Sequence, residues 1–228
     1  MRIVAYESAR VTALFSLEEV MPLGGANGRE LIPEIQSRYE FIKTTDIRTT
    51  SREEINKNGF TFEGGRFEFE GSTVNISDMA IYLDGIVVNA AKTDYAEAFI
   101  HDLINFTQKS FGFRELASKP RFYFLSQIIV EFEKPLANLI SKFSQLSEMI
   151  NEQLSPSYGK LEPVDFARLD FELDKKSMPV GMTVPRIVIE RRTNIPFNKE
   201  RYFCGAPMRT SGHIQFLEEV ERVLIRAH

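Results

Sequence analysis

The stretch FTFEGGRFEFEG, residues Phe60–Gly71, alternates Phe with Thr, Glu or Arg through Phe60, Phe62, Phe67 and Phe69. Alternation with a period of two is typical of a strand that buries one face and exposes the other. The pair Gly64–Gly65 divides the stretch, so we expect a hairpin turn or a β-bulge there. This pattern predicts an antiparallel sheet with a Phe-rich buried face, in a chain that holds 19 Phe and no Trp.

A second hairpin is expected in MAIYLDGIVVNA, where Asp84–Gly85 lies between two apolar, β-prone runs. An Asp-Gly pair in this setting is typical of a type I′ turn. Further strands are expected in SARVTALFSLEEV, RFYFLSQIIVEFE, PVDFARLDFELD, PRIVIERR and RYFCGAP.

Three long segments have helical periodicity and are expected as amphipathic helices behind the sheet: Asp94–Ser110, Pro135–Leu154 and Ser211–Ala227. The fold class is therefore α+β, with a largely antiparallel Phe-rich β-sheet backed by about three helices. We expect a single domain over residues 1–228, with a sub-boundary near 155–160 as the alternative.

A weak internal similarity links two of these segments. Both place a Thr before the helix and then Phe and an aliphatic residue at the same offsets: Thr93, Phe99 and Leu103 against Thr210, Phe216 and Val220. This similarity indicates either an old duplication of a β-β-α unit or the ordinary pattern of an amphipathic helix behind a sheet.

The segment MPLGGANGREL, Met21–Leu31, resembles a phosphate-binding loop only superficially. Arg29–Glu30 stands where a P-loop requires Lys followed by Ser or Thr. We expect a helix to begin at Pro33 and run to Tyr39, because Pro fits the first turn of a helix. The glycines Gly24–Gly28 are therefore interpreted as a flexible connection between a half-exposed strand and a short helix, and if this loop has a role, we expect it to order against a partner.

Composition limits the function classes. The net charge of −4 disfavours a general nucleic-acid binder. The one cysteine, Cys204, excludes an intrachain disulfide and favours a reducing compartment, so a cytoplasmic location is expected. No signal peptide and no apolar run of about 18 residues is found, so membrane association is not expected.

Two pairs of residues are candidates for catalysis. Cys204 and His213 could form a nucleophile and base, although a strand cysteine and a histidine on an apolar helix stripe are typical of a core. Glu97 and His101 are four residues apart on the polar face of one helix and could share a metal ion. A third ligand with matching spacing is missing, so neither a metal nor a cofactor is expected.

The middle helix offers an interaction surface. Its apolar stripe is expected to cover the sheet, while its weakly charged opposite face, with Asn138, Lys142, Gln145 and Glu148, could contact a partner. Arg191 and Arg192 at a strand end could hold a carboxylate or phosphate.

The leading hypothesis is a non-catalytic interaction or assembly protein that forms a homo-oligomer or joins a larger complex. The alternatives are a hydrolase-type enzyme that uses one of the two catalytic pairs, and a nucleic-acid accessory protein with a local Arg patch. The sequence identifies neither a partner nor a small-molecule ligand.

Overall fold

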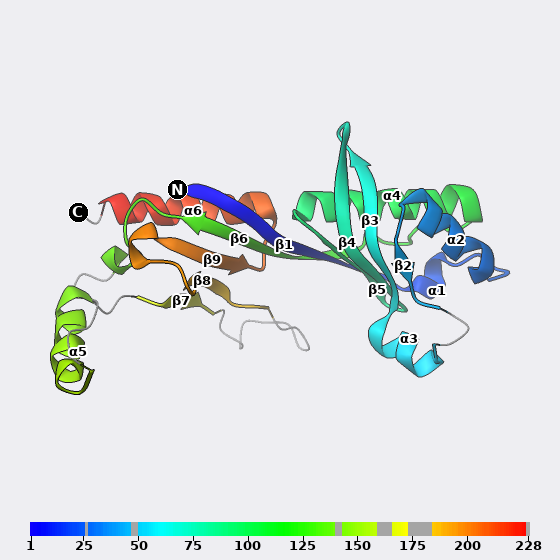
Figure 1. Cartoon of the computed structure of the whole chain (residues 1–228). Helices are drawn as coiled ribbons and strands as arrows, with labels where there is room; N and C mark the ends of the chain where they lie inside the picture. Colours follow the sequence, from blue (N-terminus) through cyan, green and yellow to red (C-terminus); the bar gives the residue numbers. More distant parts are fainter. Residues whose placement is uncertain (26, 47–49, 140–142, 159–165, 173–183, 227–228) are drawn as a thin grey trace. The chain divides into compact units, whose positions relative to one another are not determined.

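The structure is a computed structural model that describes residues 1–25, 27–46, 50–139, 143–158, 166–172 and 184–226 (Figure 1). Contacts between Cα atoms divide the chain into two compact units. The N-terminal unit comprises Ser8–Ser126 and Met208–Thr210, and the C-terminal unit comprises Met1–Glu7, Gln127–Pro207 and Ser211–His228. The expected sub-boundary at 155–160 lies inside the C-terminal unit, and the single domain stays a prediction.

The expected α+β class with a large antiparallel sheet is confirmed. Nine strands follow the order β2-β3-β4-β5-β1-β6-β9-β8-β7, and the strand pairs with a described register are antiparallel. The strands are β1 (Arg2–Leu14), β2 (Lys43–Thr44), β3 (Phe60–Phe69), β4 (Ser72–Tyr82), β5 (Gly85–Ala90), β6 (Arg121–Glu131), β7 (Arg168–Phe171), β8 (Ile187–Arg191) and β9 (Arg201–Ala206).

The structure contains more helices than the three expected. They are α1 (Leu17–Val20), α2 (Gly28–Arg38), α3 (Arg52–Asn58), α4 (Thr93–Phe111), α5 (Phe143–Tyr158) and α6 (Thr210–Arg226), with short 3-10 helices η1 (Leu136–Leu139) and η3 (Phe197–Lys199). The helices expected at Asp94–Ser110 and Ser211–Ala227 correspond to α4 and α6. Among the described residues, no helix is long and apolar enough to cross a bilayer.

The expected turn at Gly64–Gly65 is wrong, because β3 continues through both glycines and pairs with β4 on either side of them. The chain turns instead at Glu70–Gly71, where both residues have positive φ. A side chain at Gly65 would place its Cβ 2.4 Å from the ring of Phe41. Gly65 therefore serves close packing of an aromatic ring rather than a change of direction.

The hairpin at Asp84–Gly85 is present, but its turn is not type I′. Tyr82 pairs with Gly85, so Leu83 and Asp84 form the turn, and neither of them has positive φ. Gly85 is needed because a Cβ there would lie 2.2 Å from the carbonyl oxygen of Ala13 on β1.

The helix after the glycine loop begins earlier than expected. α2 begins at Gly28 and contains Pro33 inside it, so the expected start at Pro33 is wrong. Asn27 caps the helix, because its side-chain oxygen accepts a hydrogen bond from the backbone N–H of Arg29 at 3.2 Å. This cap satisfies a free N–H of the first turn and stabilises a helix start before Pro33.

The middle helix also differs from the expected Pro135–Leu154. Leu136–Leu139 forms η1, residues 140–142 lie outside the described chain, and α5 continues past Leu154 with Pro156 inside it. The expected stop before Pro156 is therefore wrong.

The core of the N-terminal unit is rich in aromatic rings. Helix α4 lies over β3, β4 and β5 (Figure 1), and Phe99 on α4 is fully buried among them. Its ring centroid lies 4.7 Å from that of Tyr39 and 5.7 Å from that of Phe67, in edge-on arrangements that favour aromatic packing. The Phe-rich buried face expected from the sequence is thus confirmed.

The core of the C-terminal unit is smaller and mainly aliphatic. Ile128 and Val130 on β6 and Ile189 on β8 pack with Leu217 and Leu224 on α6. The alternating pattern of the strands and the helical pattern of α6 each supply one apolar face to this core.

Chain order and strand order share one regularity. β1 is followed by an insert of α1, α2, β2 and α3, and then by β3–β5 and α4. β6 is followed by an insert of η1 and α5, and then by β7–β9, with η3 between β8 and β9, and by α6. In the sheet, the strands β3, β4, β5 and β1 are followed by β6, β9, β8 and β7. When β6 is matched with β1, and β7–β9 with β3–β5, the second group has the reverse order of the first.

Candidate interaction surface

The first catalytic pair is not arranged for chemistry. Cys204 on β9 is fully buried in the core of the C-terminal unit, and this burial raises the pKa of its thiol. A buried thiol with a raised pKa is a poor nucleophile. The placement matches a small apolar core residue.

His213 on α6 is also fully buried. Within the described part of the chain, neither ring nitrogen has a hydrogen-bond partner, so His213 does not hydrogen-bond to Cys204. Desolvation lowers the pKa of His213 to about 4, which keeps the imidazole neutral. The burial of His213 matches its place on the apolar stripe of α6.

The second pair, Glu97 and His101, has other partners. Both carboxylate oxygens of Glu97 accept hydrogen bonds from Arg209, one of them at 2.7 Å, and the Arg209 guanidinium lies 4.3 Å from the ring centre of Phe124. His101 is exposed and contacts the ring of Phe122. No group of three or more His, Cys, Asp or Glu that could hold a metal occurs among the described residues.

Arg191 is held inside the C-terminal unit. Its guanidinium donates to a carboxylate oxygen of Glu200 at 3.1 Å and to the Tyr202 hydroxyl at 2.8 Å, and its side chain is 7% exposed. Tyr202 also donates to Glu200 at 2.6 Å, and burial raises the pKa of its phenol. A guanidinium engaged in this way stabilises the unit and is poorly placed to hold an external phosphate.

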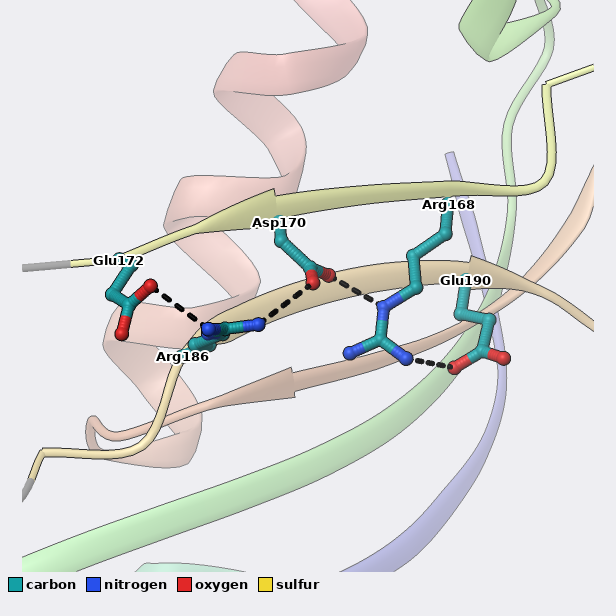
Figure 2. A network of polar contacts seen from close by, with 5 residues as sticks. All are labelled: Arg168, Asp170, Glu172, Arg186 and Glu190. Carbon is teal, nitrogen blue, oxygen red and sulfur yellow. Dashed lines mark hydrogen bonds and ion pairs between the residues drawn. The ribbon is translucent and has the colours of Figure 1, made fainter.

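Other arginines of this unit also face carboxylates. Figure 2 shows Arg168 between Asp170 and Glu190, at 2.6 and 3.5 Å, and Arg186 between Asp170 and Glu172, at 3.8 and 2.9 Å. β7 is the last strand in the sheet order, and charged side chains beside an edge strand discourage it from pairing with another chain.

Two further arginines of the C-terminal unit, Arg2 and Arg201, also pair with a carboxylate. Glu131 on β6 accepts hydrogen bonds from Arg201 and Arg2, which together lower the pKa of this carboxylate. Arg192 is half-buried, and its backbone N–H bonds to the carbonyl of Arg201 at 3.0 Å. The paired arginines do not form the unopposed basic field typical of nucleic-acid binders.

The predicted interaction residues of the middle helix are only partly described. Gln145 and Glu148 are exposed on α5. Lys142 and the side chain of Asn138 lie outside the described residues. The use of these residues for binding stays a prediction.

The apolar stripe of α5 is exposed rather than packed on the sheet. Leu146 is 50% exposed, Met149 61%, Ile150 43% and Leu154 37%. The sequence predicted this stripe, but placed it against the sheet. Exposed contiguous apolar surface is typical of a protein contact site, whereas isolated exposed apolar residues need no explanation.

The charges of α5 lie away from this stripe. At about 100° per residue, Glu148 and Glu152 lie about 160° around the helix from Ile150 on either side. Gln153, three residues after Ile150, is exposed beside the stripe and carries no charge, whereas Ser147, three residues before Ile150, is buried. α5 contains neither Lys nor Arg.

Comparison with known proteins adds no family. No protein-family model matches the chain, and no curated protein matches it. A solved structure titled Methanococcus jannaschii TBP aligns over 99% of this chain and 98% of its own, with a TM-score of 0.40 and 13% sequence identity.

Proposed function

We propose that the protein is a non-catalytic interaction protein that self-associates through the exposed apolar stripe of α5. The observation that carries this proposal is the exposure of Leu146, Ile150 and Leu154 along one face of a helix. The placement of Cys204 and His213, buried and not hydrogen-bonded to each other, supports a non-catalytic role.

A second copy of the chain fits this stripe better than other occupants. Leu146 and Leu154 are each four residues from Ile150, so an antiparallel two-fold pairing places Ile150 against Ile150 and Leu146 against Leu154. The uncharged side chain of Gln153, exposed beside the stripe, avoids repulsion between identical surfaces.

A membrane surface is a poorer occupant. Amphipathic helices that lie on membranes carry Lys and Arg on the polar face. The polar face of α5 instead carries Glu148 and Glu152. Anionic lipid would repel such a helix.

The test is sedimentation equilibrium of the full chain. We expect the native chain to show a dimer in the micromolar range and Ile150→Glu to weaken association by roughly 30-fold or more, the effect of losing one central contact residue. Ser155→Glu adds the same charge at an exposed position on the opposite face of α5 and should leave association unchanged. A native chain that is monomeric throughout, or an Ile150→Glu chain that associates normally, contradicts the proposal.

We also propose that the two halves of the chain arose by duplication of one unit. This unit consists of a strand, a helical insert, three further strands and a final helix. The reversed strand order and the matching positions of α4 and α6 support this origin. Circular dichroism and unfolding of residues 121–228 expressed alone test it, because a duplicated unit is expected to form secondary structure by itself. A fragment without cooperative unfolding would count against the proposal.

The cytoplasm is the proposed location, because the single cysteine is a buried thiol that suits a reducing compartment.

A further inference from the structure

We propose that an apolar cavity in the N-terminal unit binds a small uncharged apolar molecule, of the size of a short alkyl group. The cavity has a volume of about 100 Å³. Its wall includes Val20 from α1, Ile35 from α2, Ile86 from β5, Ile104 from α4 and Leu116 from the segment that follows α4. This site is independent of α5 and of the proposed self-association.

The chemistry of the wall favours an apolar occupant. Three polar side chains reach the cavity, and each donates its hydrogen bonds to backbone. Thr107 donates to the carbonyl of Ile104 at 2.9 Å, and Gln108 donates to the carbonyl of Arg114 at 3.4 Å. A bound water needs two to four polar partners, so a wall of this kind favours an apolar guest.

Arg114 is the third polar side chain, and its hydrogen bonds connect two chain segments that line the cavity. Its backbone N–H donates to the carbonyl of Val20 at 2.7 Å, and its guanidinium donates to the carbonyls of Met21 at 2.7 Å and Glu18 at 2.8 Å. These bonds fasten the end of α1 to the segment after α4. The cavity therefore has a defined wall, and Arg114 acts as a positioning residue.

The volume sets the size of the ligand. An apolar protein cavity of about 150 Å³ takes up benzene or xenon. A cavity of about 100 Å³ is smaller than that one. Xenon and three-carbon hydrocarbons are therefore suitable probes, whereas larger rings and charged molecules are not.

The test is a titration of the isotope-labelled full chain with xenon, followed by the methyl resonances of isoleucine. We expect saturable shifts at Ile35, Ile86 and Ile104, because these side chains line the cavity. The same titration with cyclopropane should shift the same methyl groups. Sodium propionate, which has three carbons and a charge, should shift none of them.

Two variants locate the binding. Ile104→Phe fills the cavity and should abolish the xenon shifts at Ile35 and Ile86. Val223→Phe makes a similar change at an exposed position on α6 and should retain them. Absence of saturable shifts in the native chain overturns the proposal, even if Ile104→Phe fails to fold. Saturable shifts from propionate at these methyl groups overturn the assigned ligand class.

Discussion

Thr93 and Thr210 cap each other's helices, although 117 residues separate them in the sequence. The backbone N–H of Thr93 donates to the Thr210 hydroxyl oxygen at 3.0 Å, and the backbone N–H of Thr210 donates to the Thr93 hydroxyl oxygen at 2.8 Å. Thr93 is the first residue of α4 and Thr210 the first residue of α6. The residue before Thr93, Lys92, makes no side-chain cap.

Replacing Thr93 with Val should lower the free energy of unfolding by about 1–2 kcal/mol, because it leaves the buried N–H of Thr210 without its acceptor. Thr210→Val should have a similar cost, and the double variant should cost less than the sum. Urea unfolding measures these values. Thr193→Val, at an exposed position, is the control. Strictly additive effects would show that the two hydroxyls do not act together.

Arg191→Ala should be far more damaging than Arg168→Ala. Arg191 is 7% exposed and neutralises the buried Glu200, so its loss leaves a buried carboxylate at a cost of about 3–5 kcal/mol. Arg168 belongs to the charge network of Figure 2 and is 46% exposed, so its loss should cost less than about 1 kcal/mol. Chemical denaturation compares the two variants, and equal costs would refute the distinction.

Stability should fall as the pH drops from about 6.5 toward 4. The pKa of His213 is about 4 in the folded chain against an ordinary value of 6.5, so the unfolded chain binds this proton first. The contribution is fully present above pH 6.5 and reaches about 3 kcal/mol. His213→Met should remove this part of the pH dependence, whereas the exposed His101→Met should keep it. An unchanged pH profile in His213→Met would contradict the assignment.

The thiol of Cys204 should be unreactive in the folded protein. Burial raises its pKa and shields it from reagents. A disulfide reagent at pH 8 should label it slowly in buffer and rapidly in urea. Fast labelling of the folded chain would restore Cys204 as a candidate nucleophile.

Much of the fold follows from the sequence. The alternating Phe residues of Phe60–Phe69 predicted a buried sheet face, and the periodicity of α4 and α6 predicted both helices. These patterns are strong because each depends only on local geometry. The Thr cap was visible only as a matching position in two segments, since a contact over this sequence distance has no local signal.

The errors share a physical cause. Gly64–Gly65 resembled a turn, yet Gly65 is needed because the ring of Phe41 packs on the strand. Pro33 resembled a helix start, yet Asn27, six residues before Pro33, caps the helix. In both places a tertiary or capping contact outweighs the local preference of the residue.

The candidate surface was predicted only in part. Periodicity identified the apolar stripe around Ile150, but periodicity cannot say whether a stripe is covered. The cavity beneath α1 had no sequence signal, because its wall is assembled from segments far apart in the chain.

The most direct measurement of the central claim is oxidative cross-linking of Ile150→Cys in the full chain. If two α5 helices pair about a two-fold axis at Ile150, the new cysteines face each other and form a disulfide-linked dimer under mild oxidation. Ser155→Cys, on the opposite face, should form no disulfide-linked dimer under the same conditions. Efficient cross-linking of Ile150→Cys alone supports the account, whereas no cross-linking, or equal cross-linking of both variants, contradicts it.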